Sequence, residues 1–248
     1  MAGHSKWSNI KHKKGKADAA RGKIFTKIGR EIAMAVKEGG PDPNSNGKLR
    51  DIIVKARANN MPNDNITRSI KKASGELGDV IYEEIVYEGY GPGGVAFILD
   101  AITDNRNRTA GDVRSYFSKC NGSLGTSGSV AYMFDKKGVI IVEKDENIQE
   151  DDFMLIALEC GAEDIIVYDE EFEVHTQAND VTKVNELLIE NGINTISSEI
   201  EMFPQNYVDI NDEDILKNTY KLIELLEDCD DVQKVWHNAN LPDEDEEE

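Results

Sequence analysis

The first regular pattern of apolar and polar positions in the chain covers residues 22–74 and has helical spacing. Apolar side chains recur about every 3.6 residues from Ile24 to Val36, and Gly39-Gly40-Pro41 ends this run. Two shorter runs with the same spacing follow at 49–56 and 66–70. Helices this short are not stable alone, because most helical stability in proteins comes from packing. The pattern therefore predicts a bundle of three short helices.

Beyond the helical region the pattern becomes typical of strands. Residues 84–88 and 94–102 are rich in β-branched and aromatic side chains and are predicted to be strands. A helix is expected to follow, opened by Thr109, with Asp112 three residues later at the spacing of a capping box. Residues 129–134 are predicted to form another strand. This part of the chain is therefore expected to contain a strand–helix–strand unit.

Residues 138–202 alternate in the order strand, helix, strand, strand, helix, strand. This is the βαββαβ order of a ferredoxin-like domain. The segment that follows, 206–237, has the order strand, helix, strand, which is only half of such a domain. It becomes complete if it joins the half at 94–134. The sequence therefore predicts an α+β multidomain protein, with an N-terminal three-helix domain plus two ferredoxin-like α/β domains, one inserted into the other.

A chain of 248 residues is long enough for two or three domains, which agrees with this arrangement. The last six residues are all Asp or Glu, so the C-terminus is expected to be disordered. The predicted parts are a basic arm and helical domain at 1–80, a discontinuous ferredoxin-like α/β domain at 81–135 and 205–240, an inserted ferredoxin-like α/β domain at 136–204, and a disordered acidic tail at 241–248.

The distribution of charge along the chain changes what its net charge of −20 suggests. Residues 1–80 contain 17 Lys and Arg but eight Asp and Glu, which gives +9, whereas the other 168 residues together carry −29. Electrostatic fields in physiological salt decay over about 8 Å. A distant acidic domain therefore does not cancel the field near a basic one. The first 80 residues are expected to bind a polyanion.

Residues 1–21 are dominated by lysine and have almost no apolar periodicity, which is typical of a basic arm. Lysine neutralises phosphates but lacks the bidentate geometry with which arginine reads bases, so we expect backbone contacts and a steep salt dependence. An aromatic side chain in the arm can also stack on a base. The alternative is a tail that only increases solubility. The candidate nucleic-acid-binding residues are His4, Lys6, Trp7, Lys11, His12, Lys13, Lys14, Lys16, Arg21, Lys23, Lys27 and Arg30.

A polar run at 104–109 lies between a predicted strand and the N-terminus of a predicted helix. Two interpretations stay open at this point. The run is either an ordinary loop with a helix cap, or a site for a phosphate, another anion or a protein partner. In the second case arginine side chains and helix N–H groups would face the bound group. The residues of this candidate site are Arg106, Arg108 and Thr109.

No pattern in the chain points to an enzyme, a cofactor or a metal ion. The run 89–94 fits GxGxxG, but a predicted strand follows it where a dinucleotide site requires a helix, so a turn is expected. Walker A, GxSxG and HExxH sequences do not occur. No apolar run approaches the length of about 20 residues that spans a bilayer, and the N-terminus lacks an apolar signal region. Cytoplasmic localisation without membrane contact is therefore expected.

Several motifs resemble those of one known family. They are AGHSKWSNIKH at 2–12, RGKIFTK at 21–27, NNMP at 59–62, YEGYGPGG at 87–94, TDNRNRT at 103–109, and the acidic run with Val-Gln at 226–233. Together they are distributed over nearly the whole chain, and each is highly specific. The chain is therefore identified as similar to the YebC family.

This resemblance implies a three-domain protein without enzymatic activity and without a cofactor. Members of the family are described as transcriptional regulators, and a mitochondrial relative is a translational activator of cytochrome c oxidase. The leading hypothesis is a DNA-binding transcriptional regulator, and the alternative is a translation factor that binds ribosomal RNA. The acidic α/β domains are expected to contact protein partners, in a monomer or weak dimer. Lys13 stands where the family usually has arginine, which favours backbone contact.

Overall fold

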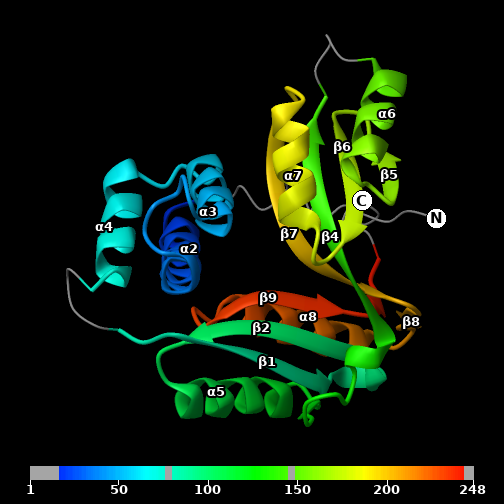
Figure 1. The fold of residues 1–248 in the computed structure, drawn as a ribbon. Coiled ribbons are helices and arrows are strands. Elements are labelled where there is room, and N and C mark those ends of the chain that lie inside the picture. The colour runs from blue at the N-terminus through cyan, green and yellow to red at the C-terminus, as the bar shows by residue number, and fades with distance from the viewer. Residues whose placement is uncertain (1–16, 76–79, 145–148, 243–248) are drawn as a thin grey trace.

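The computed structural model describes residues 17–75, 80–144 and 149–242, with side chains from residue 21 onward. Figure 1 shows a group of helices on the left, a sheet with two helices at the bottom, and an upright sheet with two helices at the upper right. No helix among the described residues is long and apolar enough to cross a membrane. The predicted α+β fold class is confirmed by the order of helices and strands and by the topology of the two sheets.

The helical domain consists of α2 (Ala17–Gly39), α3 (Gly47–Ala58) and α4 (Asn63–Ala73). The apolar side of α2 packs against both of the other helices. Ile32 of α2 and Leu49 of α3 are fully buried in this contact. The helical periodicity therefore predicted the bundle correctly.

The lower sheet combines three strands from residues 83–124 with one strand from residues 232–237. Its strands, in spatial order, are β3 (Ser123–Leu124), β1 (Glu83–Tyr90), β2 (Ala96–Thr103) and β9 (Val232–His237). Helices α5 (Arg106–Lys119) and α8 (Glu213–Glu227) cover one face, where Phe97, Phe117 and Leu222 are buried. Strand β9 pairs directly with β2, so two segments that are far apart in the chain share one sheet.

The glycine-rich run 89–94 forms the turn between the antiparallel strands β1 and β2, as predicted. Gly93 has a φ of +67° and Gly94 a φ of +81°, which residues with a side chain rarely adopt. A Cβ on Gly91 would overlap the ring of Phe97. These glycines are therefore required by the geometry of the turn, and the element that follows them is a strand.

The upper sheet has ferredoxin-like topology. Its strands, in spatial order and all antiparallel, are β5 (Asp164–Val167), β6 (Glu171–Gln177), β4 (Phe134–Glu143) and β7 (Thr195–Pro204). Helices α6 (Glu150–Cys160) and α7 (Val181–Glu190) pack on one face. The ends of β4 and β7 reach the lower sheet, where Phe134 packs with Trp236. The inserted unit is thus fixed to the sheet that surrounds it in sequence.

Two predicted strands differ from the structure. Residues 131–133 form a short 3-10 helix, and the strand predicted at 129–134 is therefore wrong except for its last residue. The physical reason is that Val130 is buried in the contact between the two sheets, which bends the chain from one sheet into the other. The strand predicted at 206–210 is reduced to β8 (Val208–Asp209), which pairs with β10 (Ala239–Asn240) outside both main sheets.

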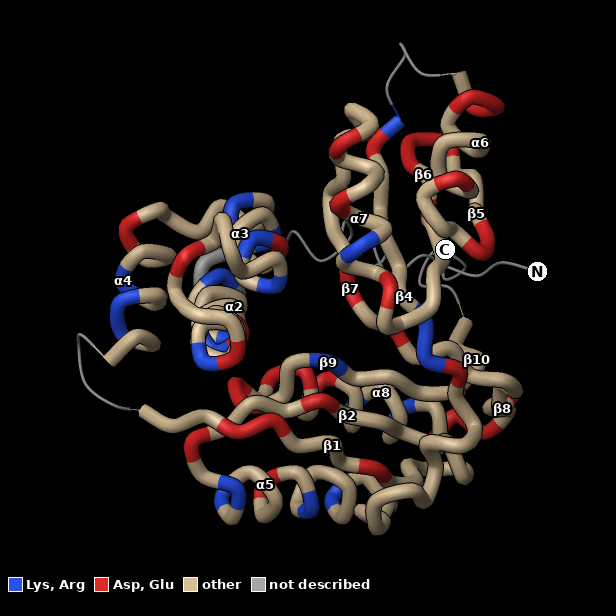
Figure 2. The backbone as a smooth tube through the Cα atoms, viewed as in Figure 1, with Lys and Arg blue, Asp and Glu red and all other residues tan. Residues whose placement is uncertain are grey.

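The charge asymmetry of the sequence becomes a spatial asymmetry. Lys and Arg are frequent on α2, α3 and α4, whereas Asp and Glu dominate α6 and the strands beside it (Figure 2).

We propose that the chain divides into domains after residues 80, 135 and 204. The last two positions are close to the start of β4 and the end of β7. Residues 243–248 of the predicted disordered tail lie outside the described residues.

A close approach of β4 to its neighbours gives a test of this packing. A Cβ on Gly138 would overlap Oγ1 of Thr176 and lie 2.6 Å from Cβ of Val181. We expect Gly138→Ala to lower the free energy of unfolding by about 1–3 kcal/mol, because the packed core must shift. The control is Gly111→Ala in α5, where nothing lies within 4 Å. It should raise the free energy of unfolding by up to about 1 kcal/mol. Urea unfolding measures both changes, and equal stability of the two variants would contradict the described register.

Candidate nucleic-acid interface

The predicted nucleic-acid-binding residues fall into two groups. Arg21, Lys23, Lys27 and Arg30 lie on α2, and Arg21 is an exposed side chain near the start of that helix. For the other group the assignment stays a prediction, because it lies outside the described residues. This group consists of His4, Lys6, Trp7, Lys11, His12, Lys13, Lys14 and Lys16.

Lys23, Lys27 and Arg30 of α2 contact an acidic segment, 227–231, at the C-terminal end of α8 in the lower domain. Lys23 forms an ion pair with Asp228, with 2.8 Å between Nζ and Oδ1. Lys27 donates to the carbonyl oxygen of Glu227 at 2.8 Å. Burial lowers the pKa of Lys27, and the nearby acidic groups offset only part of this effect. These lysines join the helical domain to the lower domain, so a nucleic acid would have to compete with protein oxygens for them.

Asp231, at the end of the acidic segment, is a buried carboxylate that binds two arginines. Arg30 donates through Nη1 to Oδ1 at 2.5 Å, and Arg108 donates through Nη2 to Oδ2 at 2.8 Å. The hydroxyl groups of Thr109 and Thr103 donate to Oδ2 at 2.6 Å and 3.3 Å. Burial alone would raise the pKa of Asp231, but the hydrogen bonds from Thr109 and Arg108 and the charge of Arg30 lower it overall. The carboxylate is thus held ionised between α2, α5 and the lower sheet.

The start of α5 differs from the sequence prediction. The helix begins at Arg106, and the side chain of Asn105 caps it by accepting the backbone N–H of Arg108 at 3.1 Å. The predicted helix start at Thr109 with Asp112 in a capping box is therefore wrong. The reason is that the hydroxyl group of Thr109 points into the core, where it is fully buried. Asparagine is among the residues that N-cap positions favour, but Asn105 was not part of the prediction.

Two of the three residues of the predicted anion site contact a carboxylate of the protein itself. Arg108 and Thr109 both contact Asp231, as described above. Arg106 lies apart from them, exposed at the surface, with Nη1 3.7 Å from Oε2 of Glu83. The contact with Asp231 gives this polar run a role within the fold. Binding of an external phosphate or partner at this site stays a prediction.

A second polar cluster joins all three parts of the molecule. Lys55 of α3 lies 2.9 Å from carboxylate oxygens of both Glu31 of α2 and Glu199 of β7. Lys234 of β9 lies 2.5 Å from Glu199 and 2.9 Å from Glu201. Burial would raise the pKa of Glu199, but the two lysines lower it overall. The helical domain is therefore fixed against both sheets, and Lys55 is engaged within the protein.

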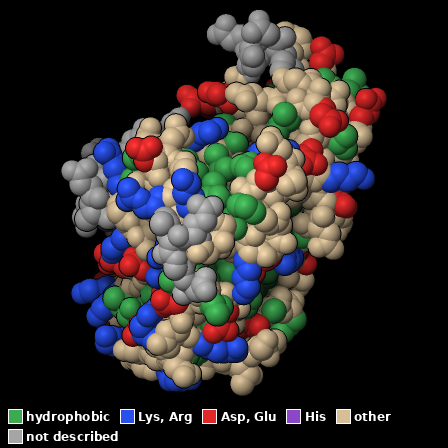
Figure 3. All heavy atoms as spheres, turned by 60° about the vertical axis from the view of Figure 1, so that its left-hand side comes forward, with side chains coloured by type: hydrophobic (Ala, Val, Ile, Leu, Met, Phe, Trp, Pro, Cys, Tyr) green, Lys and Arg blue, Asp and Glu red, His purple; other side chains and the backbone are tan. Residues whose placement is uncertain are grey.

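Cations without such partners lie on α4. Arg68, Lys71 and Lys72 form one exposed row, here called the α4 ridge, because residues three and four apart share a helix face. Their side chains form no hydrogen bond or ion pair with the part of the chain that the structure describes, and the same holds for the exposed Arg57 of α3. On the side of the molecule that Figure 3 shows, Lys and Arg are most frequent in the left and lower parts, and Asp and Glu are most frequent toward the upper right.

The α4 ridge was absent from the predicted site residues, although the sequence contains a signal for it. Residues 65–75 include three cations at helical spacing and not one acidic residue. Among the described residues, no group of His, Cys, Asp or Glu is arranged to hold a metal ion. The helical domain therefore presents positive charge to a partner on the α4 ridge and at Arg57 near the end of α3.

Family models place the chain within a known family. The model described as "TACO1/YebC protein N-terminal domain" matches residues 5–76, and the model described as "TACO1/YebC second and third domain" matches residues 82–239. The chain belongs to the TACO1/YebC family. The resemblance inferred from the sequence motifs is thereby confirmed.

Full-length relatives and a solved structure agree with this membership of the TACO1/YebC family. A relative from Acetivibrio thermocellus named "Probable transcriptional regulatory protein" is 59% identical over 238 residues, covering 96% of this chain and 98% of the relative. A relative from Thermoanaerobacter pseudethanolicus with the same description is 53% identical over 247 residues, covering 100% of both. A crystal structure of a conserved hypothetical protein from Aquifex aeolicus has a TM-score of 0.82 and 44% identity, over 97% of this chain and 98% of that one.

The buried carboxylate of this TACO1/YebC protein gives a test with a defined pH dependence. We expect Asp231→Asn to lower the free energy of unfolding at pH 7 by about 3 kcal/mol, because removing one member of a buried ion pair leaves uncompensated charge. The pKa of Asp231 is lower in the folded state, so its contribution is present above the unfolded pKa of about 3.9 and is lost as the pH falls through the folded value. Urea unfolding at pH 7 and at pH 3 measures this effect. The difference in free energy of unfolding between Asp231→Asn and the original protein should be smaller at pH 3.

The matched control for this substitution is Asp228→Asn in the same acidic segment. Asp228 pairs with Lys23 at an exposed position, where water and salt screen the interaction. Its loss should therefore change the free energy of unfolding much less than the loss of Asp231. Equal stability of the two variants at pH 7 would contradict the role assigned to the buried carboxylate.

Proposed function

We propose that this protein is a non-enzymatic regulator of transcription that acts in the cytoplasm by binding nucleic acid, with DNA as the expected target. The family membership and the relatives named as transcriptional regulatory proteins support the regulatory part of the proposal. In the described residues no GxGxxG sequence is followed by a helix, and the chain has no Walker A sequence. Both observations support a role without nucleotide chemistry.

The observation that carries the nucleic-acid part is the set of exposed cations on the helical domain. Residues 17–75 contain 12 Lys and Arg and six Asp and Glu. Lys23 and Arg30 of α2 and Lys55 of α3 are paired with acidic groups of the other domains. Lys27 donates to a carbonyl oxygen there, whereas the α4 ridge and Arg57 have no such partner among the described residues. A cation that has no acidic partner within the protein can bind a phosphate of a nucleic acid. Such binding releases counterions from the phosphate backbone and so favours the complex.

The N-terminal arm would extend this basic surface. Residues 1–16 contain five lysines and no acidic residue, and they directly precede α2. The arm and the α4 ridge therefore belong to the same basic part of the chain. We expect both to contact the sugar–phosphate backbone and to contribute little sequence selectivity.

The acidic domains would have a different role. Residues 136–204 contain 18 Asp and Glu but only four Lys. Repulsion between these carboxylates and phosphates would direct a nucleic acid to the helical domain. We propose that the acidic surface contacts protein partners, and that the protein is a monomer or a weak dimer.

A charge substitution on the ridge tests the proposal. We expect the triple variant Arg68→Gln, Lys71→Gln, Lys72→Gln to bind a short DNA more weakly at every salt concentration. The slope of log affinity against log salt should decrease by about 1 for each cation that contacts a phosphate. Fluorescence anisotropy with a labelled oligonucleotide, as single strand and as duplex, measures both quantities.

The matched control removes the same number of charges from the acidic domains. The triple variant Lys183→Gln, Lys217→Gln, Lys221→Gln changes exposed lysines on α7 and α8. It should bind DNA with the affinity and the salt slope of the original protein. If the two triple variants lose affinity equally, only net charge matters and the α4 ridge is not an interface.

A further inference from the structure

A pocket lies between α2, α4 and the segment 80–82 that leads into β1. Its volume is about 240 Å³. Gly29 and Ala33 of α2 and Ala73 of α4 line it with small groups, which leaves space between the two helices. This volume is below the about 300–1,000 Å³ that is usual for sites that enclose a whole small-molecule ligand. The pocket therefore fits one group of a larger partner better than a separate metabolite.

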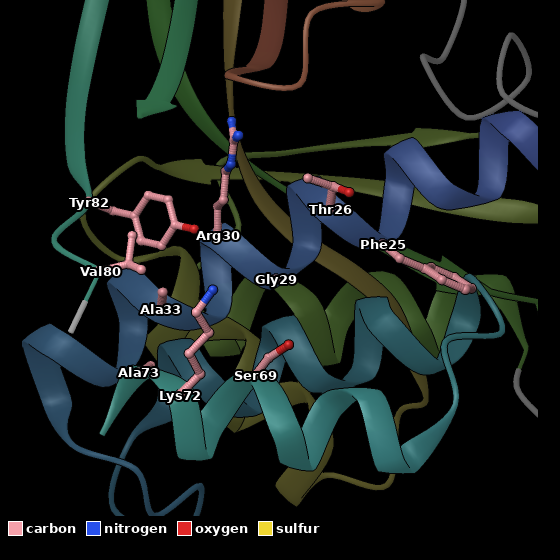
Figure 4. A pocket seen from close by; sticks show the side chains of 10 residues that line it. All are labelled: Phe25, Thr26, Gly29, Arg30, Ala33, Ser69, Lys72, Ala73, Val80 and Tyr82. Atoms are coloured by element: carbon pink, nitrogen blue, oxygen red, sulfur yellow. The ribbon is translucent and has the colours of Figure 1, made fainter. Parts of the chain in front are cut away.

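All polar side chains of the pocket can donate hydrogen bonds, the three hydroxyl groups can also accept them, and none of the lining residues is acidic. In Figure 4, the amino group of Lys72 rises from α4 and the hydroxyl end of Tyr82 reaches in from the opposite side, toward the space beside Gly29. The guanidinium group of Arg30 lies 5.9 Å from the centre of the Tyr82 ring. Because Asp231 binds the same guanidinium group, the Tyr82 side of the pocket is held in place.

This combination of groups selects among possible occupants. A free phosphate would need cations but not the apolar space beside Gly29. An acidic side chain of a protein would use Lys72 but would leave the aromatic wall of Tyr82 unused. A nucleobase is flat and has acceptors at its edge, and aromatic side chains with a nearby cation are the usual platform for unpaired bases.

The α4 ridge leads to this pocket. Lys72 belongs to both, and Arg68 and Lys71 continue the row of cations along the same helix face. From Arg68 to Lys72 the helix rises by about 6 Å, which is four residues at 1.5 Å each. A strand whose backbone follows the ridge would therefore bring a base to the mouth of the pocket.

We propose that the pocket between α2 and α4 receives one unpaired base of a nucleic-acid strand whose phosphates lie on the α4 ridge. This inference rests on the proposed function, because it assumes that the ridge binds nucleic acid. It adds that the partner is single-stranded at the contact, since a base within a duplex is stacked and cannot enter. RNA and single-stranded DNA share this chemistry.

The test fills the pocket without changing charge. Ser69 of α4 lines the pocket, and Ser69→Leu would occupy it. The matched control is Thr67→Leu on the same helix, an exposed position outside the pocket lining. The probes are a short oligonucleotide as single-stranded RNA, as single-stranded DNA and as a DNA duplex, with binding measured by fluorescence anisotropy. Thermal unfolding of each variant checks that the fold is retained.

We expect the original protein to bind both single strands more tightly than the duplex. Stacking of one base on an aromatic side chain contributes about 1–3 kcal/mol, so Ser69→Leu should weaken single-strand binding about 5- to 150-fold. Duplex binding, which uses the basic arm and the α4 ridge but not the pocket, should stay unchanged, and Thr67→Leu should behave like the original protein. A strand with 2-aminopurine at an unpaired position should change its fluorescence on binding, and this change should disappear in Tyr82→Ala.

The outcomes separate the inference from the function on which it rests. Unchanged single-strand affinity in Ser69→Leu, with nucleic acid still bound by the original protein, would overturn the base pocket but not the proposed function. A polyglutamate peptide that binds the original protein and not Ser69→Leu would assign the pocket to an acidic protein segment instead. If the original protein binds none of the nucleic-acid probes, the proposed function fails and the inference fails with it.

Discussion

A carboxylate that is buried must be paired, and the pairing of Asp231 determines how the helical domain is attached to the rest of the molecule. Its oxygens accept hydrogen bonds from Arg30 of α2, from Arg108 and Thr109 at the start of α5, and from Thr103 at the end of β2. Removal of Asp231 would leave the guanidinium group of Arg30, which is largely buried, without its ion-pair partner.

This constraint divides the cations of the helical domain into two sets. Lys23, Lys27 and Arg30 of α2 contact the acidic segment 227–231, and Lys55 contacts Glu199 in the second cluster. The cations of the α4 ridge are exposed and have no ion-pair partner among the described residues, so they are available to an external polyanion. The acidic α/β domains thus neutralise part of the basic domain and leave a defined part of it exposed.

Local patterns predicted most of the fold. Helical spacing predicted α2 to α4, and the βαββαβ order predicted the topology of the upper sheet. The failures have one physical cause, which is that long-range contacts override local signals. Residues 131–133 look like a strand but turn into the interface of the two sheets around Val130, and Thr109 looks like a cap but donates to Asp231.

The candidate site was less predictable than the fold, for a related reason. The density of lysine identifies the basic end of the chain, but it does not tell which cations are already bound. Lys27 contacts a carbonyl oxygen 200 residues away, and no local pattern indicates such a partner. The α4 ridge could have been found, because its spacing and the lack of acidic neighbours are local features. The pocket beside it could not, because it requires α2, α4 and the segment 80–82 to be packed together.

Nucleic acid should bind the cations that are not paired with the other domains. Ultraviolet cross-linking of a bound oligonucleotide, followed by mass spectrometry of the peptides, locates the contact. We expect cross-links in residues 1–16 and on α4, around Lys71 and Lys72. Cross-links concentrated at Lys23, Lys27 and the segment 227–231, with α4 unmodified, would contradict this expectation.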